Sequence, residues 1–505
     1  MSDKAKQLTK ELYDLTKEIT VLNSCQAILD WDERTYMPPN GSENRANQAA
    51  LLAGMVHDKF TSPRIGEIIN ELIYAGIDPE ADNVDSANLR EIKRAYDKAV
   101  KVPKSLVEEL SRTITMGQRA WQEAREKSDF PAFQPWMEKI VKLKRQQAEA
   151  VGYKGVPYNA MLDDFEPGAS TAHITKVFAG LRDELVKLLT KIRESGTKPD
   201  GSIITRDYPV ERQRQFGTDA AKAIGFNFDS GRLDETVHPF CTGFGPGDIR
   251  ITTRYDKNHF PQAFFGILHE AGHGIYEQGL PVEYYGAPCG ESASLGIHES
   301  QSRMWENMVG RSKSFWKHFF PKAQKTFPEA LSDVTIDQFH FAVNDVRSSY
   351  IRVEADEATY NLHILLRFEM ESAFFNGDIS VAEVPALWSE KFEKYFGIKP
   401  ENDKVGCLQD VHWSAGLIGY FPTYTLGNLF AAQFFAKAKE DLGDLDSQFA
   451  AGDFKPLFGW LRENIHSYGQ RYRADDLVEK ITGKPLTHKP LMDYLNTKYG
   501  ELYKL

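Results

Sequence analysis

The chain has 505 residues, 41% apolar and 26% charged, a composition typical of a globular protein that buries a large core. Its 61 basic and 72 acidic residues give a net charge of −11 with no long basic block, so we expect no nucleic-acid partner. There is no signal-peptide core, no run of about 18 apolar residues and no close pair among four cysteines, so we expect no membrane span and a cytoplasmic protein with reduced thiols.

Helices are predicted over most of the chain. Apolar residues from Leu8 to Leu22 recur at steps of three and four, which predicts a helix over 5–30. Further helices are expected over 90–99, 105–127 and 132–151, and from a cap at Ser170 or Thr171 to about Ser195.

One segment in the middle of the chain has the pattern of a strand. Asp248–Tyr255 alternates, is rich in β-branched residues and follows the glycine-rich turn Gly243–Gly247. Helical patterns then continue from about residue 261 to the end, without a repeat or a low-complexity linker. The predicted fold class is therefore mainly α: one domain over 1–505 with a small β-sheet.

The segment His269-Glu270-Ala271-Gly272-His273 carries the most specific chemistry. Residues four apart share one face of a helix, so His269 and His273 can hold one metal ion. A water on a zinc ion has a pKa near ~7, and the neighbouring Glu270 carboxylate can take its proton as it attacks a carbonyl. Pro261 suits the first turn of this helix, and Gly272 suggests that something lies close to its backbone.

A catalytic zinc needs a third protein ligand and one open position. Several downstream carboxylates could supply it: Glu277, Glu283, Glu291, Glu299 and Glu306. Arg303 lies four residues after Glu299 and could orient it, but spacing alone does not separate Glu299 from Glu291.

Segments along nearly the whole chain resemble the carboxypeptidase Taq family of metallocarboxypeptidases. The matching segments are Ile28–Asp32, Thr35–Pro38, Tyr158–Gly168, His238–Phe240, Asp248–Thr252, His298–Gln301, Ile351–Asp356, Gly406–Trp413 and Gly419–Tyr424. Each is weak by itself, but together they keep the family's order around the metal motif. The match at His298–Gln301 selects Glu299 as the third ligand.

This resemblance implies a two-lobed helical fold around a deep groove, similar to angiotensin-converting enzyme and neurolysin. It implies one metal, usually Zn²⁺ with Co²⁺ able to substitute, and a homodimer. It also implies that peptide substrates lose single C-terminal residues, with broad specificity but little activity before proline.

The resemblance also suggests roles for other polar residues. His412, Tyr420 and Tyr424 are candidates for stabilising the oxyanion of peptide hydrolysis, which needs fixed donors. Arg352 and Arg250 are candidates for binding the terminal carboxylate, since a guanidinium can bind it bidentately. For Arg352 the alternative is a helical ion pair with Asp356, and for Arg250 structural support of its strand.

Some assignments remain open on the sequence alone. His238 could contact the substrate or close the groove. The same metal motif would serve a zinc oligopeptidase or a dipeptidyl carboxypeptidase of this fold. A non-catalytic protein with a structural metal is the third alternative, but such a site has no use for the Glu270 base. The four cysteines are predicted to be buried thiols.

Overall fold

The computed structural model describes residues 2–505, which divide into two compact units, each built from separate stretches of chain. Unit 1 consists of the N-terminal segment to Ala99, Asp200–Val343 and Phe434–Gly483, and unit 2 of Val100–Pro199, Asn344–Gln433 and Lys484–Leu505. None of the helices described between residues 2 and 505 is both long and apolar enough to cross a bilayer.

Unit 1 contains the β-strands of the described residues and most of the shorter helices. Its elements are α1 (Asp3–Thr35), α2 (Ser42–Phe60), α3 (Pro63–Tyr74), α4 (Val84–Lys101), α9 (Val210–Ile224), β1 (Gly231–Glu235), β2 (Cys241–Gly243), β3 (Ile249–Thr253), α10 (Phe260–Glu277), α11 (Leu295–Arg303), the π-helix η6 (Met304–Val309), α12 (Lys313–Thr326), α13 (Pro328–Leu331), α14 (Ile336–Ala342), α18 (Leu445–Ala451), α19 (Lys455–Asn464) and α20 (Ala474–Thr482).

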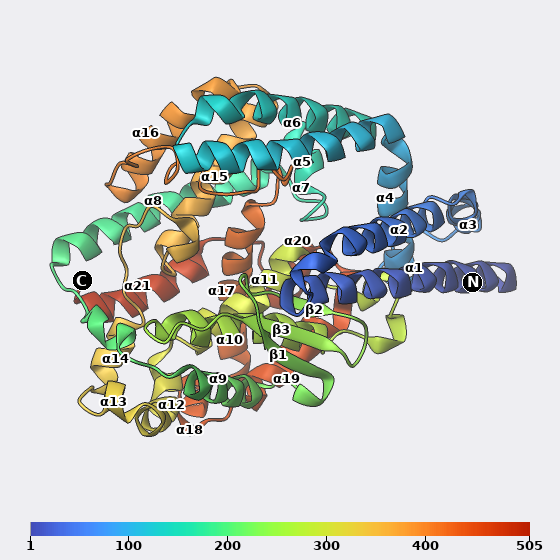
Figure 1. Cartoon of the computed structure of the whole chain (residues 1–505). Helices are drawn as coiled ribbons and strands as arrows, with labels where there is room; N and C mark the ends of the chain where they lie inside the picture. The colour runs from blue at the N-terminus through green and yellow to red at the C-terminus, as the bar shows by residue number, and fades with distance from the viewer. Residues whose placement is uncertain (1) are drawn as a thin grey trace. The chain divides into compact units, whose positions relative to one another are not determined.

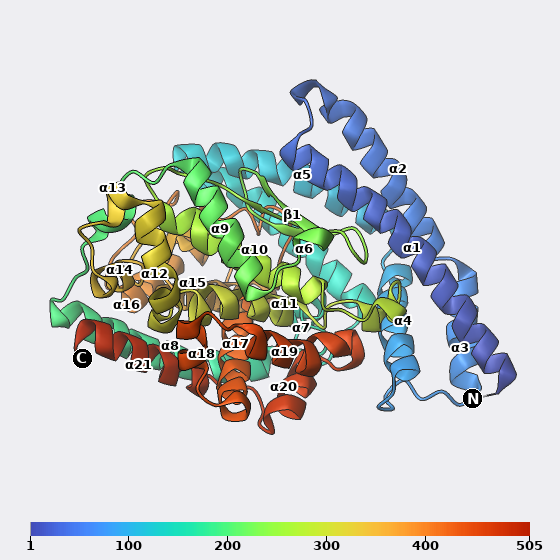
Figure 2. The same cartoon turned by 90° about the horizontal axis from the view of Figure 1, so that it is seen from below.

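Unit 2 is built from long helices. They are α5 (Lys104–Lys127), α6 (Phe130–Val151), α7 (Tyr158–Leu162), α8 (Thr171–Ser195), α15 (Thr359–Asn376), α16 (Val384–Phe396) and α21 (Lys489–Tyr503). The 3₁₀ turn η7 (Arg352–Glu354) comes directly before α15. The helix α17 (Pro422–Leu442) begins in unit 2 and ends in unit 1. Helices α8 and α21 come from distant parts of the sequence and lie side by side (Figure 2).

The three-stranded sheet of unit 1 packs on α10, the helix that carries the metal motif (Figure 1). The strand order is β1-β3-β2, with β1 parallel and β2 antiparallel to β3. The predicted strand is confirmed as β3, whereas β1 and β2 were not predicted. The small sheet therefore fixes one face of α10.

An aromatic core packs on another side of α10. The rings of Phe260 and Phe264 stack with their centroids 5.2 Å apart, and Trp316 lies 5.2 Å from Phe264. Pro261 stands in the first turn, as predicted, where its missing N–H costs no hydrogen bond. Burying side chains of this size stabilises the helix by about 2 kcal/mol each, which offsets the glycines in it.

The other predicted helices are confirmed within a few residues, but one prediction on cysteines is wrong. All four cysteines are free thiols, yet only Cys289 and Cys407 are buried; Cys25 is exposed and Cys241 is partly exposed. Cys25 lies on α1 with its side chain toward solvent, so it has no core to fill.

Candidate metal centre

The metal motif occupies one face of α10, and Glu299 reaches the same place from α11. The Ser294 side chain caps α11 by accepting from the backbone N–H of Ile297. At Gly272 a Cβ atom would stand 2.6 Å from the Cα of Ser302, so α10 and α11 touch backbone to backbone there. Gly272 is therefore required by helix packing, which confirms the expectation that something lies close to its backbone.

The three candidate ligands converge. Ligand atoms of His269, His273 and Glu299 all lie within 4.8 Å of one another. Glu299 Oε2 is 3.7 Å from His269 Nε2 and 3.4 Å from His273 Nε2. Tetrahedral ligands about 2.0–2.1 Å from a zinc ion are about 3.3–3.4 Å apart, so the donor set and its spacing fit zinc.

The surroundings favour the ligand forms of Glu299 and His273, whereas for His269, although burial opposes it, the charge of Glu299 and the contact with Glu306 raise the pKa. Although burial opposes it, the charges of Arg303 and His269 hold the pKa of Glu299 far below its usual range. Burial, and then the charge of His298, lowers the pKa of His273 to about 3. A carboxylate and a neutral imidazole are the forms that bind metal.

A second layer of polar contacts holds the ligands in place. Glu306 Oε2 lies 2.9 Å from His269 Nδ1. Arg303 donates to Glu299 Oε1 (2.7 Å) and to Glu306 Oε2 (3.1 Å), so one guanidinium joins both carboxylates. Glu306 was a candidate ligand from the sequence, and the structure places it behind His269 instead. It belongs to the π-helix that follows α11, a local geometry that is frequent at functional sites.

Glu270 is buried beside the candidate ligand His269. Burial raises its pKa to about 7, with the charge of His269 acting in the opposite direction. A carboxyl group with a pKa near neutrality can accept a proton and return it, as a general base and acid must.

The other candidates in unit 1 lie on or beside the sheet. Arg250 donates through Nε and Nη2 to the two carboxylate oxygens of Asp248, both at 2.8 Å, and its guanidinium lies over Trp31 and Phe244 at 4.5 and 4.7 Å. These contacts favour structural support of the strand for Arg250. His238 is exposed in the segment before β2.

Arg352 lies in unit 2 in a different context from the one predicted. It is in the 3₁₀ turn η7 and not in a helix, and its partner is Asp410 rather than Asp356. Asp356 accepts from the backbone N–H groups of Ala358 and Thr359 at the start of α15, which explains why it does not pair with Arg352.

Asp410 joins two buried arginines. Its Oδ1 accepts from Arg352 Nε at 3.0 Å, and its Oδ2 accepts from Arg367 Nε at 2.6 Å. Arg352 is 6% exposed and Arg367 is fully buried, so two positive charges face one carboxylate. A buried excess of positive charge favours an anionic ligand. The sequence analysis did not single out Arg367, which lies on the largely buried helix α15.

The three oxyanion candidates come together in unit 2. The His412 ring centroid lies 5.6 Å from that of Tyr420 and 6.3 Å from that of Tyr424, and the two tyrosines are 5.3 Å apart. Burial lowers the pKa of His412 to about 4, despite the nearby charge of Asp410, so its imidazole is neutral at pH 7.

A buried carboxylate that the sequence analysis missed holds this segment. Glu371, on α15, accepts from Tyr158 Oη (2.6 Å), Trp413 Nε1 (2.9 Å) and the backbone N–H of Gly419 (3.0 Å). Trp413 directly follows His412, and Gly419 directly precedes Tyr420. Glu371 therefore fixes the loop that presents both side chains.

Comparisons with known proteins identify a metallopeptidase family. A family model described as carboxypeptidase Taq (M32) metallopeptidase matches residues 11–499. Thermostable carboxypeptidase 1 of Thermus thermophilus is 46% identical over 98% of both chains, and carboxypeptidase 1 of Bacillus subtilis is 41% identical over 98% of this chain and 99% of the relative. The crystal structure of the M32 carboxypeptidase from Deinococcus radiodurans superposes with a TM-score of 0.95 at 37% identity, covering 99% of this chain and 100% of the other.

Proposed function

The chain belongs to the carboxypeptidase Taq (M32) metallopeptidase family, and from this premise we propose that it removes single residues from peptide C-termini, with broad specificity but not before proline. It is a metal-dependent peptide hydrolase of the carboxypeptidase type. The observation that carries the proposal is the convergence of two histidines and one carboxylate beside a buried glutamate.

We assign the metal to His269, His273 and Glu299, with zinc as the ion and cobalt able to substitute. When bound, such an ion polarises the carbonyl of the scissile bond and makes the attacking water more acidic. The spacing of the three ligand atoms supports this assignment.

Glu270 acts as the general base. It takes a proton from the water that attacks the carbonyl carbon, and it returns that proton to the nitrogen of the departing amino acid. Its burial supports the role, because a pKa of about 7 suits both transfers at neutral pH.

The residues of unit 2 complete the proposed assignment. His412, Tyr420 or Tyr424 would donate a hydrogen bond to the oxyanion as charge develops there. Arg352 would bind the terminal carboxylate of the peptide, and the excess positive charge around Asp410 supports this. Since Asp410 already occupies the Nε–Nη2 side of Arg352, the free carboxylate would meet the Nη1 side, where Nη1 donates to Tyr360 Oη at 3.0 Å.

In unit 1, His238 remains a candidate for contact with the peptide, because it is exposed beside β2. Arg250 remains a weaker candidate because Asp248 holds two of its three donor nitrogens, Nε and Nη2. We further propose that both units act as one catalytic domain, since the family model spans both, and that the protein is a cytoplasmic homodimer.

The decisive experiment compares a peptide with its C-terminally amidated copy, with products identified by mass spectrometry. Release of single residues from the free acid alone supports the proposal, and equal cleavage of both peptides would refute it. Products two residues long would instead indicate a dipeptidyl carboxypeptidase. Glu270→Gln should keep the metal, measured by elemental analysis, and abolish hydrolysis. Light scattering of the purified protein tests the dimer.

A further inference from the structure

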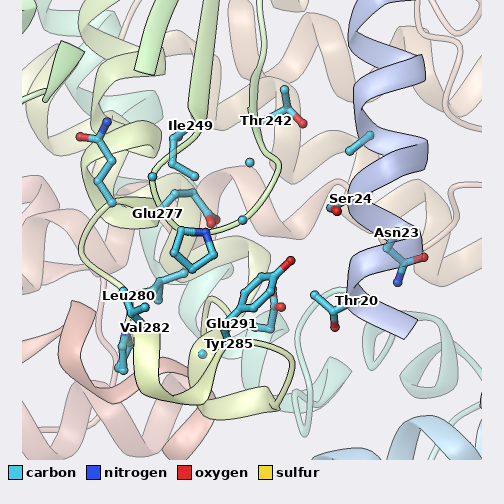
Figure 3. Close-up of a pocket in the computed structure, with 18 of the residues that line it drawn as sticks. Thr20, Asn23, Ser24, Thr242, Ile249, Glu277, Leu280, Val282, Tyr285 and Glu291 are labelled. Carbon is cyan, nitrogen blue, oxygen red and sulfur yellow. The ribbon is translucent and has the colours of Figure 1, made fainter. Parts of the chain in front are cut away.

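A cavity of about 470 Å³ opens next to the metal centre, within unit 1. Figure 3 shows one wall formed by Thr20, Asn23 and Ser24 of α1, and the facing wall with Glu277 and Glu291. This volume falls in the range of small-molecule and peptide pockets.

His298 connects this cavity to the metal ligands. It lines the cavity, and its ring stacks on that of His273 with centroids 4.4 Å apart and planes 21° apart. On the other side, its Nε2 lies 2.8 Å from Glu277 Oε1. The cavity is therefore separated from the candidate ligand His273 by the one side chain of His298.

The strand β2 offers this cavity an open edge. It lies at one end of the strand order, and the backbones of Phe240 and Phe244 bond toward the β3 side at 3.0 and 2.9 Å. Because bonded and non-bonded positions alternate along an antiparallel pair, the backbone groups of Cys241 and Gly243 point away from β3. Both of these residues line the cavity, so an extended peptide can pair with them there.

Two carboxylates line the cavity, and one of them, Glu277, has the imidazole of His298 beside it. Its described lining includes Glu277 and Glu291 and no lysine or arginine. Desolvation of its carboxyl group, and then the charge of Glu277, raises the pKa of Glu291 to about 7. A positively charged group between the two carboxylates would relieve this repulsion.

We propose that this cavity binds the N-terminal end of short peptide substrates, with the backbone along β2 and the α-ammonium group between Glu277 and Glu291. The inference rests on the proposed carboxypeptidase function and adds substrate selection to it: peptides with a free N-terminus, of the length that spans from the metal centre to Glu291, are preferred. The ammonium group matches both the charge and the polar walls of the cavity.

The test uses the metal-loaded enzyme and a length series of peptides with one C-terminal sequence, each with a free and with an acetylated N-terminus. At the optimal length, we expect kcat/KM to favour the free form by about tenfold, in line with one well-placed charge-assisted contact. Glu291→Gln should reduce that preference to about twofold or less by lowering kcat/KM for the free peptides. Glu283→Gln, an exposed glutamate outside the cavity, is the matched control and should keep the preference.

The outcomes separate the two proposals. Equal kcat/KM for free and acetylated peptides at every length, or a preference that survives Glu291→Gln, would overturn the N-terminal subsite while the carboxypeptidase function stands. A preference for lysine side chains at an inner position, without one for the free N-terminus, would also overturn it. Absence of cleavage of all peptides, acetylated and free, would count against the carboxypeptidase function itself.

Discussion

Replacing Glu306 by glutamine should weaken zinc binding although Glu306 is not among the three converging ligands. Its Oε2 lies 2.9 Å from His269 Nδ1 and 3.1 Å from Arg303 Nη1. Glutamine keeps the shape and one acceptor oxygen but removes the negative charge. His269 then becomes a weaker electron donor. Of the two carboxylates that Arg303 contacts, Glu299 and Glu306, only Glu299 keeps its charge.

The magnitude follows from the type of contact. Loss of a partner behind a metal-bound histidine typically lowers metal affinity 10- to 100-fold, which corresponds to about 1.4–2.7 kcal/mol. Arg303 increases this loss of affinity, because without the Glu306 charge its positive charge acts mainly on Glu299 and makes that candidate ligand a weaker donor. We therefore expect a loss toward the upper end of that range.

The assay is a titration of the metal-free enzyme with zinc in competition with a chromogenic chelator, on protein shown to be folded by circular dichroism. Glu329→Gln is the matched control, because Glu329 makes only an exposed ion pair with Arg212, at 2.9 Å, and should leave zinc affinity unchanged. A folded Glu306→Gln protein with a zinc Kd within twofold of the original would refute the reasoning.

Three further predictions concern stability and substrate binding. Asp410→Asn should raise KM more than it lowers kcat, because Arg352 loses the carboxylate that holds it in position. The same change should lower the free energy of unfolding, measured in urea, by about 3–5 kcal/mol. An unchanged KM would count against the role of Arg352. Gly272→Ala should destabilise by at least ~1–3 kcal/mol through a backbone clash, whereas Gly54→Ala, in open space on α2, should stabilise by about 0.5–1 kcal/mol, both measured by urea denaturation. Burial lowers the pKa of His466 to about 3, below the ~6.5 of the unfolded chain, so the stabilisation from keeping this imidazole neutral is complete above pH 6.5 and is lost on acidification. Between pH 7.5 and 5, the free energy of unfolding of the original protein should therefore fall by about 2 kcal/mol more than that of His466→Gln. Equal losses in the two proteins would contradict this.

The helix that carries the metal motif could be predicted from the sequence almost to the residue, because its signals are local. Pro261 marks its start, and its apolar stripe matches the helical period. The strands β1 and β2 could not be predicted in the same way. The sequence from Gly231 to Glu235 has no strand pattern, and it is extended only because it pairs with β3.

The candidate site shows the same division between local and tertiary information. Spacing along α10 identified His269 and His273, but Glu299 and Glu291 could not be separated without the close contact of α10 with α11. The family resemblance supplied that choice. The ion pair of Arg352 with Asp356, the alternative considered on the sequence, does not form, because Arg352 pairs with a carboxylate 58 residues away that only the fold brings near.

The division of unit 1 into separate stretches has a consequence for biosynthesis. The His466 ring packs against Tyr276 of α10 at 5.0 Å and bonds to Gln301 of α11 at 3.0 Å, so the last stretch of unit 1 supports the two helices that carry the candidate ligands. Nearly all of the chain must leave the ribosome before this support exists. Metal capture in its final geometry is therefore a post-translational event, and a truncated chain that ends before α19 would display the complete motif without a mature centre.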